Sequence, residues 1–173
     1  MREFVILGLD PGTHRTGYGV VRFRGGAREA IAHGVIEPVA SNTPERLAFL
    51  EREALKLIRR HAPDRLAIER LYFSKNQKTA LSVAEARGAL LLAGHKGKVP
   101  VIELDPTVVK QRVTGYGHAD KRSVLKLIRL IFVMKDFSPL DDASDALAIA
   151  LAAEGEAFLA GPASSSRAGS PGH

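Results

Sequence analysis

The stretch FVILGLDPG, residues 4–12, decides the fold of this chain. Its continuous apolar run predicts a buried strand, and Asp10-Pro11-Gly12 at the end of the run predicts a turn. Asp10 therefore closes a strand, which is the position where an α/β sheet places its functional site.

The segments on the C-terminal side of this stretch extend the sheet. Gly17–Phe23 and Glu29–Val39 have strand patterns and are joined through Gly25-Gly26, which is a hairpin signal. The first three strands are therefore expected to form an antiparallel meander.

The spacing of the apolar residues then changes to that of a helix. The helix is predicted to begin at Thr43-Pro44-Glu45, with a capping residue and Pro at its first position, and to stop near Ala62-Pro63. The short apolar strand Arg65–Glu69 follows, and this strand, helix, strand succession places Glu69 at the carboxyl end of a central strand. The later elements are expected to be a helix at Thr79–Gly94, a strand at Val99–Leu104, a short helix at Pro106–Val113, a basic helix at Lys121–Met134 and a final helix beginning near Pro139-Leu140-Asp141.

The predicted fold class is α/β, with a five-stranded mixed sheet in which an antiparallel meander is followed by parallel strands, flanked by helices. The 173 residues suit one domain, which we assign to residues 1–158. Ser, Gly and Pro are frequent toward the C-terminus, so residues 159–173 are expected to form a disordered tail.

The chain contains no cysteine, which excludes a disulfide framework and a thiolate metal site. Any metal would therefore be bound by oxygen or imidazole ligands. No apolar run approaches the roughly 18 residues that a membrane span needs, and the N-terminus runs into a strand pattern rather than a signal-peptide core. We expect a cytoplasmic protein without a membrane partner.

The formal net charge is +6, and the excess lies in one segment. Between Lys96 and Lys135 there are nine Lys or Arg residues against three acids, so this segment alone carries +6. A basic segment beside a balanced remainder predicts a polyanionic partner. Nucleic acid is favoured over a membrane surface because no amphipathic anchor accompanies the segment. The alternative is a solvated helix face that serves solubility.

Acidic residues stand at the ends of otherwise apolar elements: Asp10, Glu69, and the pair Asp142 and Asp145. The pair is spaced by three residues, so the two carboxylates share a helix face and repel each other unless a cation lies between them. Turn chemistry at Asp10 and helix capping by the pair are the alternatives. Glu69 has no comparable role at a strand end. Four carboxylates suit two Mg²⁺ ions, which can clamp the attacking and leaving oxygens of a phosphodiester.

Longer motifs make a family resemblance specific. They are ILGLDPG at residues 6–12, TGYGV at 16–20, AIE at 67–69 and DASDALAIA at 142–150. Together they resemble the RuvC family of bacterial Holliday-junction resolvases over residues 4–153. Further landmarks follow in order: Lys75-Asn76, Ala86-Arg87-Gly88, Val109-Lys110-Gln111 and Gly117–Lys121.

The resemblance implies an RNase H-like fold and a symmetric homodimer that resolves four-way (Holliday) DNA junctions by paired nicks, in recombination and repair. It implies two Mg²⁺ ions per subunit, with Mn²⁺ as a substitute, and collaboration with the RuvA and RuvB branch-migration proteins. By position it assigns metal binding and catalysis to Asp10, Glu69, Asp142 and Asp145. It assigns a catalytic and DNA-contacting role to Lys110 and Lys121, with Arg122 as a further DNA contact.

Members of the family commonly place a Phe three residues after the strand Glu, where it stacks on junction bases. This chain departs from the pattern with Tyr72, followed by Phe73. A phenol ring also stacks, at roughly 1–3 kcal/mol per base, so Tyr72 is predicted to take the role, with Phe73 as the alternative. Lys75 and Asn76 extend the predicted DNA-binding loop. Asp141 adds a further acid next to Asp142, which leaves open which of these carboxylates reaches the metal.

The helix at residues 79–94 is the candidate dimer interface, because its apolar residues cover more than one face. A helix wholly buried in one subunit is the alternative. Two other functions remain open: a resolvase-like nuclease of ribosomal RNA processing, and a junction-binding protein without catalysis. The loop after Asp10 also resembles the phosphate loop of actin-like ATPases and sugar kinases, but one copy of the fold is too short to close over a nucleotide.

Overall fold

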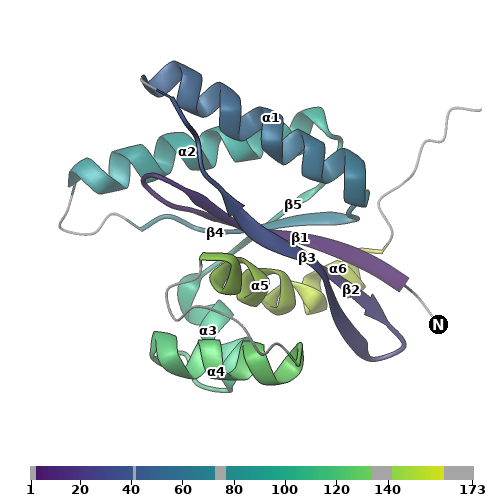
Figure 1. The fold of residues 1–173 in the computed structure, drawn as a ribbon. Coiled ribbons are helices and arrows are strands. Elements are labelled where there is room, and N and C mark those ends of the chain that lie inside the picture. The colour runs from purple at the N-terminus through teal and green to yellow at the C-terminus, as the bar shows by residue number, and fades with distance from the viewer. Residues whose placement is uncertain (1–2, 41, 73–76, 134–141, 162–173) are drawn as a thin grey trace, which may run out of the picture.

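The computed structural model describes residues 3–40, 42–72, 77–133 and 142–161. Five strands form one mixed sheet in the order β3-β2-β1-β4-β5 (Figure 1). They are β1 (Glu3–Pro11), β2 (Thr16–Arg24), β3 (Ala27–Ile36), β4 (Arg65–Glu69) and β5 (Val101–Leu104). The first three strands are antiparallel, whereas β4 runs parallel to β1 and to β5. The predicted five-stranded mixed sheet is therefore confirmed.

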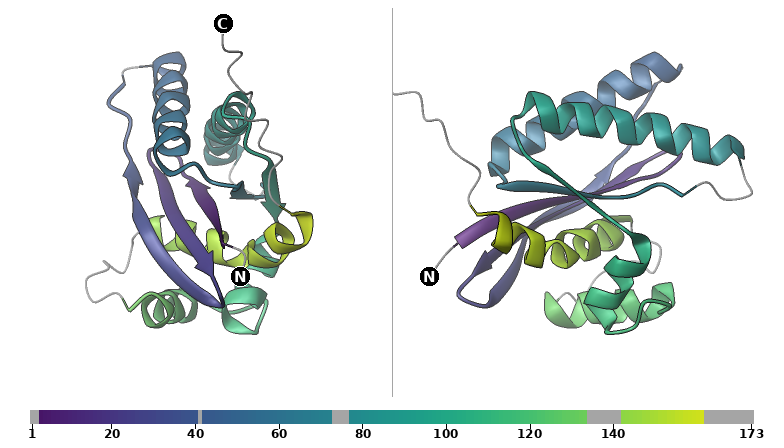
Figure 2. Two further views of the ribbon diagram at one scale, coloured as in Figure 1. Left: turned by 90° about the vertical axis from the view of Figure 1, so that its right-hand side faces the viewer. Right: turned by 180° about the vertical axis from the view of Figure 1, so that it is seen from behind.

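Helices cover both faces of this sheet (Figures 1 and 2). On one face lie α1 (Thr43–His61) and α2 (Gln77–Lys96), and on the other lies α5 (Asp142–Ala152). Beyond α5 lie α3 (Pro106–Thr114) and α4 (Lys121–Ile131), and α6 (Glu154–Ala160) follows α5. The residue that caps α1 is Asn42, whose side chain accepts a hydrogen bond from the Glu45 amide at 2.9 Å.

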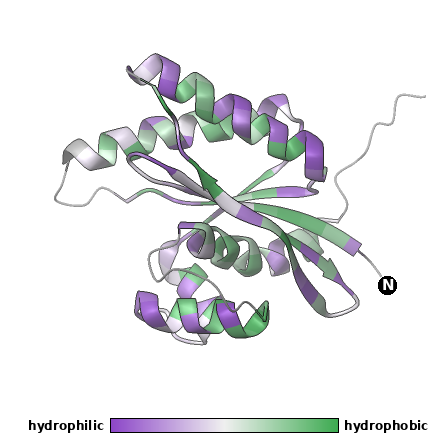
Figure 3. Ribbon diagram, viewed as in Figure 1, coloured by the Kyte–Doolittle hydropathy of each residue, from purple (hydrophilic) through white to green (hydrophobic). Residues whose placement is uncertain are grey.

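Side chains alternate along the strands between two hydrophobic cores, as the two-residue period of a strand requires. On β1, Leu7 and Leu9 join the core under α1 and α2, whereas Ile6 joins the core under α5. On β4, Ile68 joins the first core and Ala67 the second. The helix α5 is apolar along most of its length (Figure 3), which fits its buried place between the sheet and the helices α3 and α4.

Glycines in the sheet let α5 lie directly on β1 and β2. A Cβ added to Gly8 would stand 2.1 Å from the carbonyl oxygen of Ala146, and one added to Gly17 would stand 2.0 Å from the carbonyl oxygen of Asp142. Gly19 has the same relation to the Leu147 side chain, at 2.8 Å. At Gly8 and Gly17 the backbone of α5 therefore rests directly on the backbone of the sheet.

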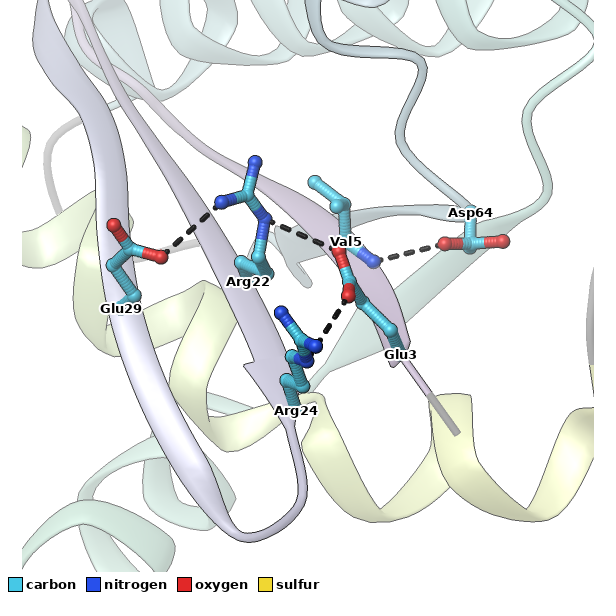
Figure 4. A network of polar contacts seen from close by, with 6 residues as sticks. All are labelled: Glu3, Val5, Arg22, Arg24, Glu29 and Asp64. Carbon is cyan, nitrogen blue, oxygen red and sulfur yellow. Dashed lines mark hydrogen bonds and ion pairs between the residues drawn. The ribbon is translucent and has the colours of Figure 1, made fainter. Parts of the chain in front are cut away.

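The end of the sheet away from Asp10 is joined by polar contacts (Figure 4). Asp64 fixes the start of β4 against β1, because its carboxylate accepts from the Val5 amide at 2.8 Å and its own amide donates to the Val5 carbonyl at 2.8 Å. Arg22 bridges Glu3 at 3.4 Å and Glu29 at 3.2 Å. Exposed ion pairs contribute only about 0–1 kcal/mol each, so the Asp64 contacts matter more for the register of these parallel strands.

Two strand boundaries differ from the prediction because of proline. The strand β3 ends at Ile36 and not at Val39, since Pro38 has no N–H for a ladder hydrogen bond. The strand β5 begins at Val101, two residues later than predicted, and Pro100 precedes it. Both corrections shorten strands without moving any predicted site residue.

The C-terminal helix α6 was not predicted from the sequence. It continues through Ala160, past the predicted boundary between residues 158 and 159, while residues 162–173 of the predicted tail lie outside the described residues. Residues 139–141, at the predicted start of the final helix, also lie outside the described residues. The basic helix α4 ends at Ile131 and not at Met134 as predicted, because Phe132 is its C-cap and Val133 has a φ of 52°, which a helix does not allow. Among the helices that the structure describes, none has the length and hydropathy to cross a membrane.

We expect Gly8→Ala to lower the free energy of unfolding by about 1–3 kcal/mol, the usual cost of overpacking a filled core. The matched control is Gly155→Ala in α6, where an added Cβ meets nothing within 4 Å. The control should leave stability unchanged or raise it by up to about 1 kcal/mol, because Ala favours a helix over Gly. Urea denaturation followed by circular dichroism measures both, and equal stabilities of the two variants would contradict the direct contact of α5 with β1.

Candidate active site

Asp10 and Glu69 lie at the ends of neighbouring parallel strands and on the same face of the sheet. Asp10 comes two residues after Gly8, and Glu69 comes two residues after Ala67, both of which face α5. Because Leu9 is the register partner of Ile68, the two acids reach the same level of the sheet. Both side chains are half-buried.

The first turn of α5 brings Asp142 and Asp145 to these strand ends. One carboxylate oxygen from each of Asp10, Asp142 and Asp145 lies within 4.8 Å of the others. Glu69 stands outside that group but lines the same pocket as Asp10 and Asp145, whose volume is about 350 Å³. The structure therefore gathers the four acids from three separate elements, β1, β4 and α5.

Burial and mutual repulsion raise the pKa of both strand-end acids. Burial is the largest cause that raises the pKa of Asp10 from 3.8 to about 7, and the charges of Asp145, Glu69 and Asp142 add to it. Burial also raises the pKa of Glu69 to about 7, with Asp145 as the next cause. Shifts of this size, produced by burial and like charges together, are typical of functional sites.

Two lysines line the pocket beside the acids. Lys121, the first residue of α4, donates a hydrogen bond to Asp145 Oδ2 at 2.6 Å. This hydrogen bond is the main cause that raises the pKa of Lys121, so its ammonium group stays charged. Lys110 of α3 is half-buried in the same pocket and opposes the rise in the pKa of Glu69. Arg122, the next residue of α4, is exposed and does not line the pocket.

Arg15 is a site residue that the sequence reasoning did not identify. Its Nε forms an ion pair with Asp142 Oδ2. Arg15 lies in the loop between β1 and β2, where the Gly12 amide donates to the Arg15 carbonyl at 2.9 Å. The available signal was a basic residue in the turn that directly follows the strand-end acid Asp10. The acids are thus flanked by cations from this loop and from α4.

A hydrogen bond to Asp105 holds the aromatic residue Tyr72, which follows β4. Tyr72 is 57% exposed, and its hydroxyl donates to the carboxylate of Asp105, the residue that precedes α3. This hydrogen bond raises the pKa of Tyr72 and lowers that of Asp105. Four other predicted site residues lie outside the described residues: Phe73, Lys75, Asn76 and Asp141.

The four acids fit a hard divalent cation. Carboxylate oxygens are the ligands that Mg²⁺ and Mn²⁺ prefer, and three of the four are already within mutual reach of one ion. Burial and, after it, the neighbouring carboxylates raise the pKa values of Asp10 and Glu69, so the site disfavours their charged forms. A divalent cation would relieve that repulsion.

Comparison with known proteins identifies the family. The family described as "Crossover junction endodeoxyribonuclease RuvC" matches residues 6–153. A relative of that name from Chloroflexus aggregans is 45% identical over 146 residues, which cover 84% of this chain and 89% of the relative. Another from Syntrophomonas wolfei is 39% identical over 147 residues, which cover 84% of this chain and 86% of the relative.

A solved structure agrees with these relatives. The structure titled "T. thermophilus RuvC in complex with Holliday junction substrate" matches with a TM-score of 0.83 at 31% identity, covering 91% of this chain and 96% of that one. This match confirms the predicted RNase H-like class of the mixed sheet and its flanking helices. The matched residues include Asp10, Glu69, Asp142 and Asp145. This chain therefore belongs to the RuvC family of crossover junction endodeoxyribonucleases.

Proposed function

We propose that this chain is a divalent-metal-dependent endonuclease that resolves four-way DNA junctions by paired symmetric nicks, in homologous recombination and DNA repair. One observation carries the proposal: Asp10, Glu69, Asp142 and Asp145 meet beside two lysines in a chain of the RuvC family. The T. thermophilus relative was solved with a Holliday junction substrate, which supports the same substrate class here.

The four acids would hold two Mg²⁺ ions, for which Mn²⁺ would substitute. When bound, such ions supply Lewis acidity that activates a water molecule and stabilises the leaving 3′ oxygen. The contribution of the chain is placement, because β1, β4 and α5 fix the acids before any ion arrives. Lys110 and Lys121 place positive charge in the same pocket, where it would stabilise the charge that develops on a phosphate.

DNA would approach along the basic edge of the pocket. Arg122 and Lys126 are exposed on α4 beyond Lys121, and phosphate contacts from such residues provide affinity that weakens with salt. The exposed ring of Tyr72 offers a face for base stacking. Phe73, Lys75 and Asn76 lie outside the described residues and stay predicted DNA contacts. The proposal includes collaboration with RuvA and RuvB.

The alternatives have less support. A junction-binding protein without catalysis would have no use for Asp10 and Glu69 in a pocket where burial, and after it the neighbouring carboxylates, raises the pKa of each to about 7. A nuclease of ribosomal RNA processing would belong to a different family from the one matched over residues 6–153.

Helix α2 carries the proposed dimer interface. Leu81 and Leu92 are exposed on it, and a Cβ added to Gly88 would meet nothing within 4 Å. These three residues are spaced so that they share one face of the helix, and a small residue between two leucines permits close approach of a second copy. Paired nicks across a four-way junction require two sites related by a two-fold axis, which an isologous interface provides.

Cleavage of a synthetic four-way junction tests the proposed function. In Mg²⁺ we expect paired nicks in the junction and no comparable cutting of linear duplex or of ribosomal RNA hairpins. Asp10→Asn should abolish cutting, because it removes a ligand charge, and should leave junction binding in gel-shift assays unchanged. The matched control, Asp64→Asn at the far end of β4, should keep cutting. A wild-type protein that binds junctions without nicking them would refute the proposal.

Asp10→Asn should also stabilise the metal-free protein, because it removes one of the repelling charges. At pH 8 we expect its melting temperature to exceed that of the wild type by roughly 2–8 °C, at about 2–4 °C per kcal/mol. Differential scanning calorimetry in EDTA measures this difference. A lower melting temperature for the variant would mean that Asp10 supports the fold instead of straining it.

Metal binding should strengthen as pH rises from 6 to 8. Asp10 and Glu69 have pKa values of about 7 without metal, and metal ligands must be deprotonated, so binding should release protons in the lower part of this range. Stability of the metal-free protein should change in the opposite direction. A carboxyl group whose pKa is raised on folding stabilises the protein at low pH and loses that contribution as pH rises through about 7.

Calorimetric titration with Mn²⁺ in buffers of different ionisation enthalpy measures the proton release. An affinity for Mn²⁺ that is independent of pH between 6 and 8 would contradict metal binding by carboxyl groups that titrate near 7.

Leu92→Asp should convert a dimer to a monomer, because it places a charge on the exposed face of α2 that carries Leu81, Gly88 and Leu92. Leu159→Asp is the matched control, since Leu159 is also an exposed leucine but lies on α6. Light scattering coupled to size-exclusion chromatography measures the mass. The same mass for both variants would exclude this face of α2 as the interface.

A further inference from the structure

Arg87 of α2 bonds to the backbone of a predicted metal ligand. Its Nε donates to the carbonyl oxygen of Glu69 at 3.1 Å, and its Nη2 forms an ion pair with Glu103 of β5. The Arg87 side chain is only 17% exposed and does not line the pocket of acids. One guanidinium group therefore joins α2 to the end of β4 and to its neighbouring strand.

The Glu69 carbonyl needs a donor from outside the sheet. The ladder between β1 and β4 ends at Leu9 and Ile68, and the next donor position on β1 is Pro11, which has no N–H. On the other side of β4, β5 is bonded to the following residue, because the Arg70 amide donates to the Leu104 carbonyl at 2.8 Å. Arg87 thus supplies the hydrogen bond that a regular parallel ladder would have supplied.

A second arginine bonds to the loop after Asp10 in a similar way. Arg46 of α1 is 16% exposed; its Nη1 donates to the carbonyl of Thr13 at 3.3 Å, and its Nη2 pairs with Glu85 of α2 at 3.1 Å. Glu85 and Arg87 therefore connect α2 to the main chain behind both strand ends. Neither arginine reaches the pocket, so both act through the backbone.

We propose that Arg87 is a positioning residue for the metal site, which fixes the main chain at Glu69 and thereby the place of its carboxylate. The inference rests on the proposed metal-dependent function. Groups that orient metal ligands typically change metal affinity or activity by about 10–100-fold when removed. An arginine is suited to this role because its planar fork bonds a carbonyl and a carboxylate at once.

Three variants test the proposal by separating the bond to the carbonyl from charge and from general stability. Arg87→Gln should weaken Mn²⁺ binding by about 10-fold or more and lower kcat accordingly, with KM and junction affinity in Ca²⁺ unchanged. Arg87→Lys keeps the charge near Glu103 but loses the fork, so its Mn²⁺ affinity should fall between those of Arg87→Gln and the wild type. Arg28→Gln removes another Arg–Glu pair, at 2.8 Å to Glu154, and should bind Mn²⁺ as the wild type does.

A further control addresses loosening of β4. Arg65 is buried at the opposite end of this strand, where it donates to the carbonyl of Gly161 at 2.7 Å. Arg65→Gln should lower the melting temperature yet leave Mn²⁺ affinity intact. Calorimetric titration well below each melting temperature provides the comparison.

Three results would overturn the proposal. They are unchanged Mn²⁺ affinity in Arg87→Gln, an equal loss of Mn²⁺ affinity in Arg65→Gln, and a loss of junction binding in Arg87→Gln with Mn²⁺ affinity intact, which would make Arg87 a DNA contact. Failure of the wild type itself to bind Mn²⁺ and to nick a junction would instead refute the proposed function, so the two failures are distinguishable.

Discussion

The four carboxylates of Asp10, Glu69, Asp142 and Asp145 gather at one end of the sheet and repel one another, and the rest of the structure holds them in place. The pKa of about 7 at both Asp10 and Glu69 reflects first the loss of water around the two groups and then this repulsion. The opposing free energy comes from the two cores on either face of the sheet and from the Asp64 contacts that fix β4 against β1. A cation that binds only the folded chain would offset this repulsion and raise the stability of the fold.

Basic residues around the acids fall into two sets with different tasks. Lys110 and Lys121 line the pocket, where their charge offsets that of the acids and would attract a phosphate. Arg46 and Arg87 stand behind the strand ends and bond to main-chain carbonyls. The side chains of Arg46 and Arg87 are largely buried. They can therefore fix the main chain at the strand ends without contacting DNA. In the proposed function, different side chains therefore attract the substrate and place the metal ligands.

The sequence predicted the parts of the site that depend on local pattern. Asp10 and Glu69 were placed correctly at strand ends because an apolar run and its terminating acid are adjacent in the chain. Their meeting with the first turn of α5 could not be derived from spacing, since it depends on contacts between β2 and a helix more than a hundred residues away. The bond from Arg87 to the Glu69 carbonyl was missed for the same reason, because no pattern reports which carbonyl a strand leaves without a donor.

The contact between α5 and the glycines of the sheet limits how this protein can vary. Every missense change of a glycine codon adds at least a Cβ, and at Gly8 and Gly17 that atom already overlaps the main chain of α5. These codons therefore have no conservative neighbour in the genetic code. Drift at either position requires a compensating shift of α5, which would carry Asp142 and Asp145 with it. Selection on nuclease activity would therefore act on two residues that bear no functional group at all.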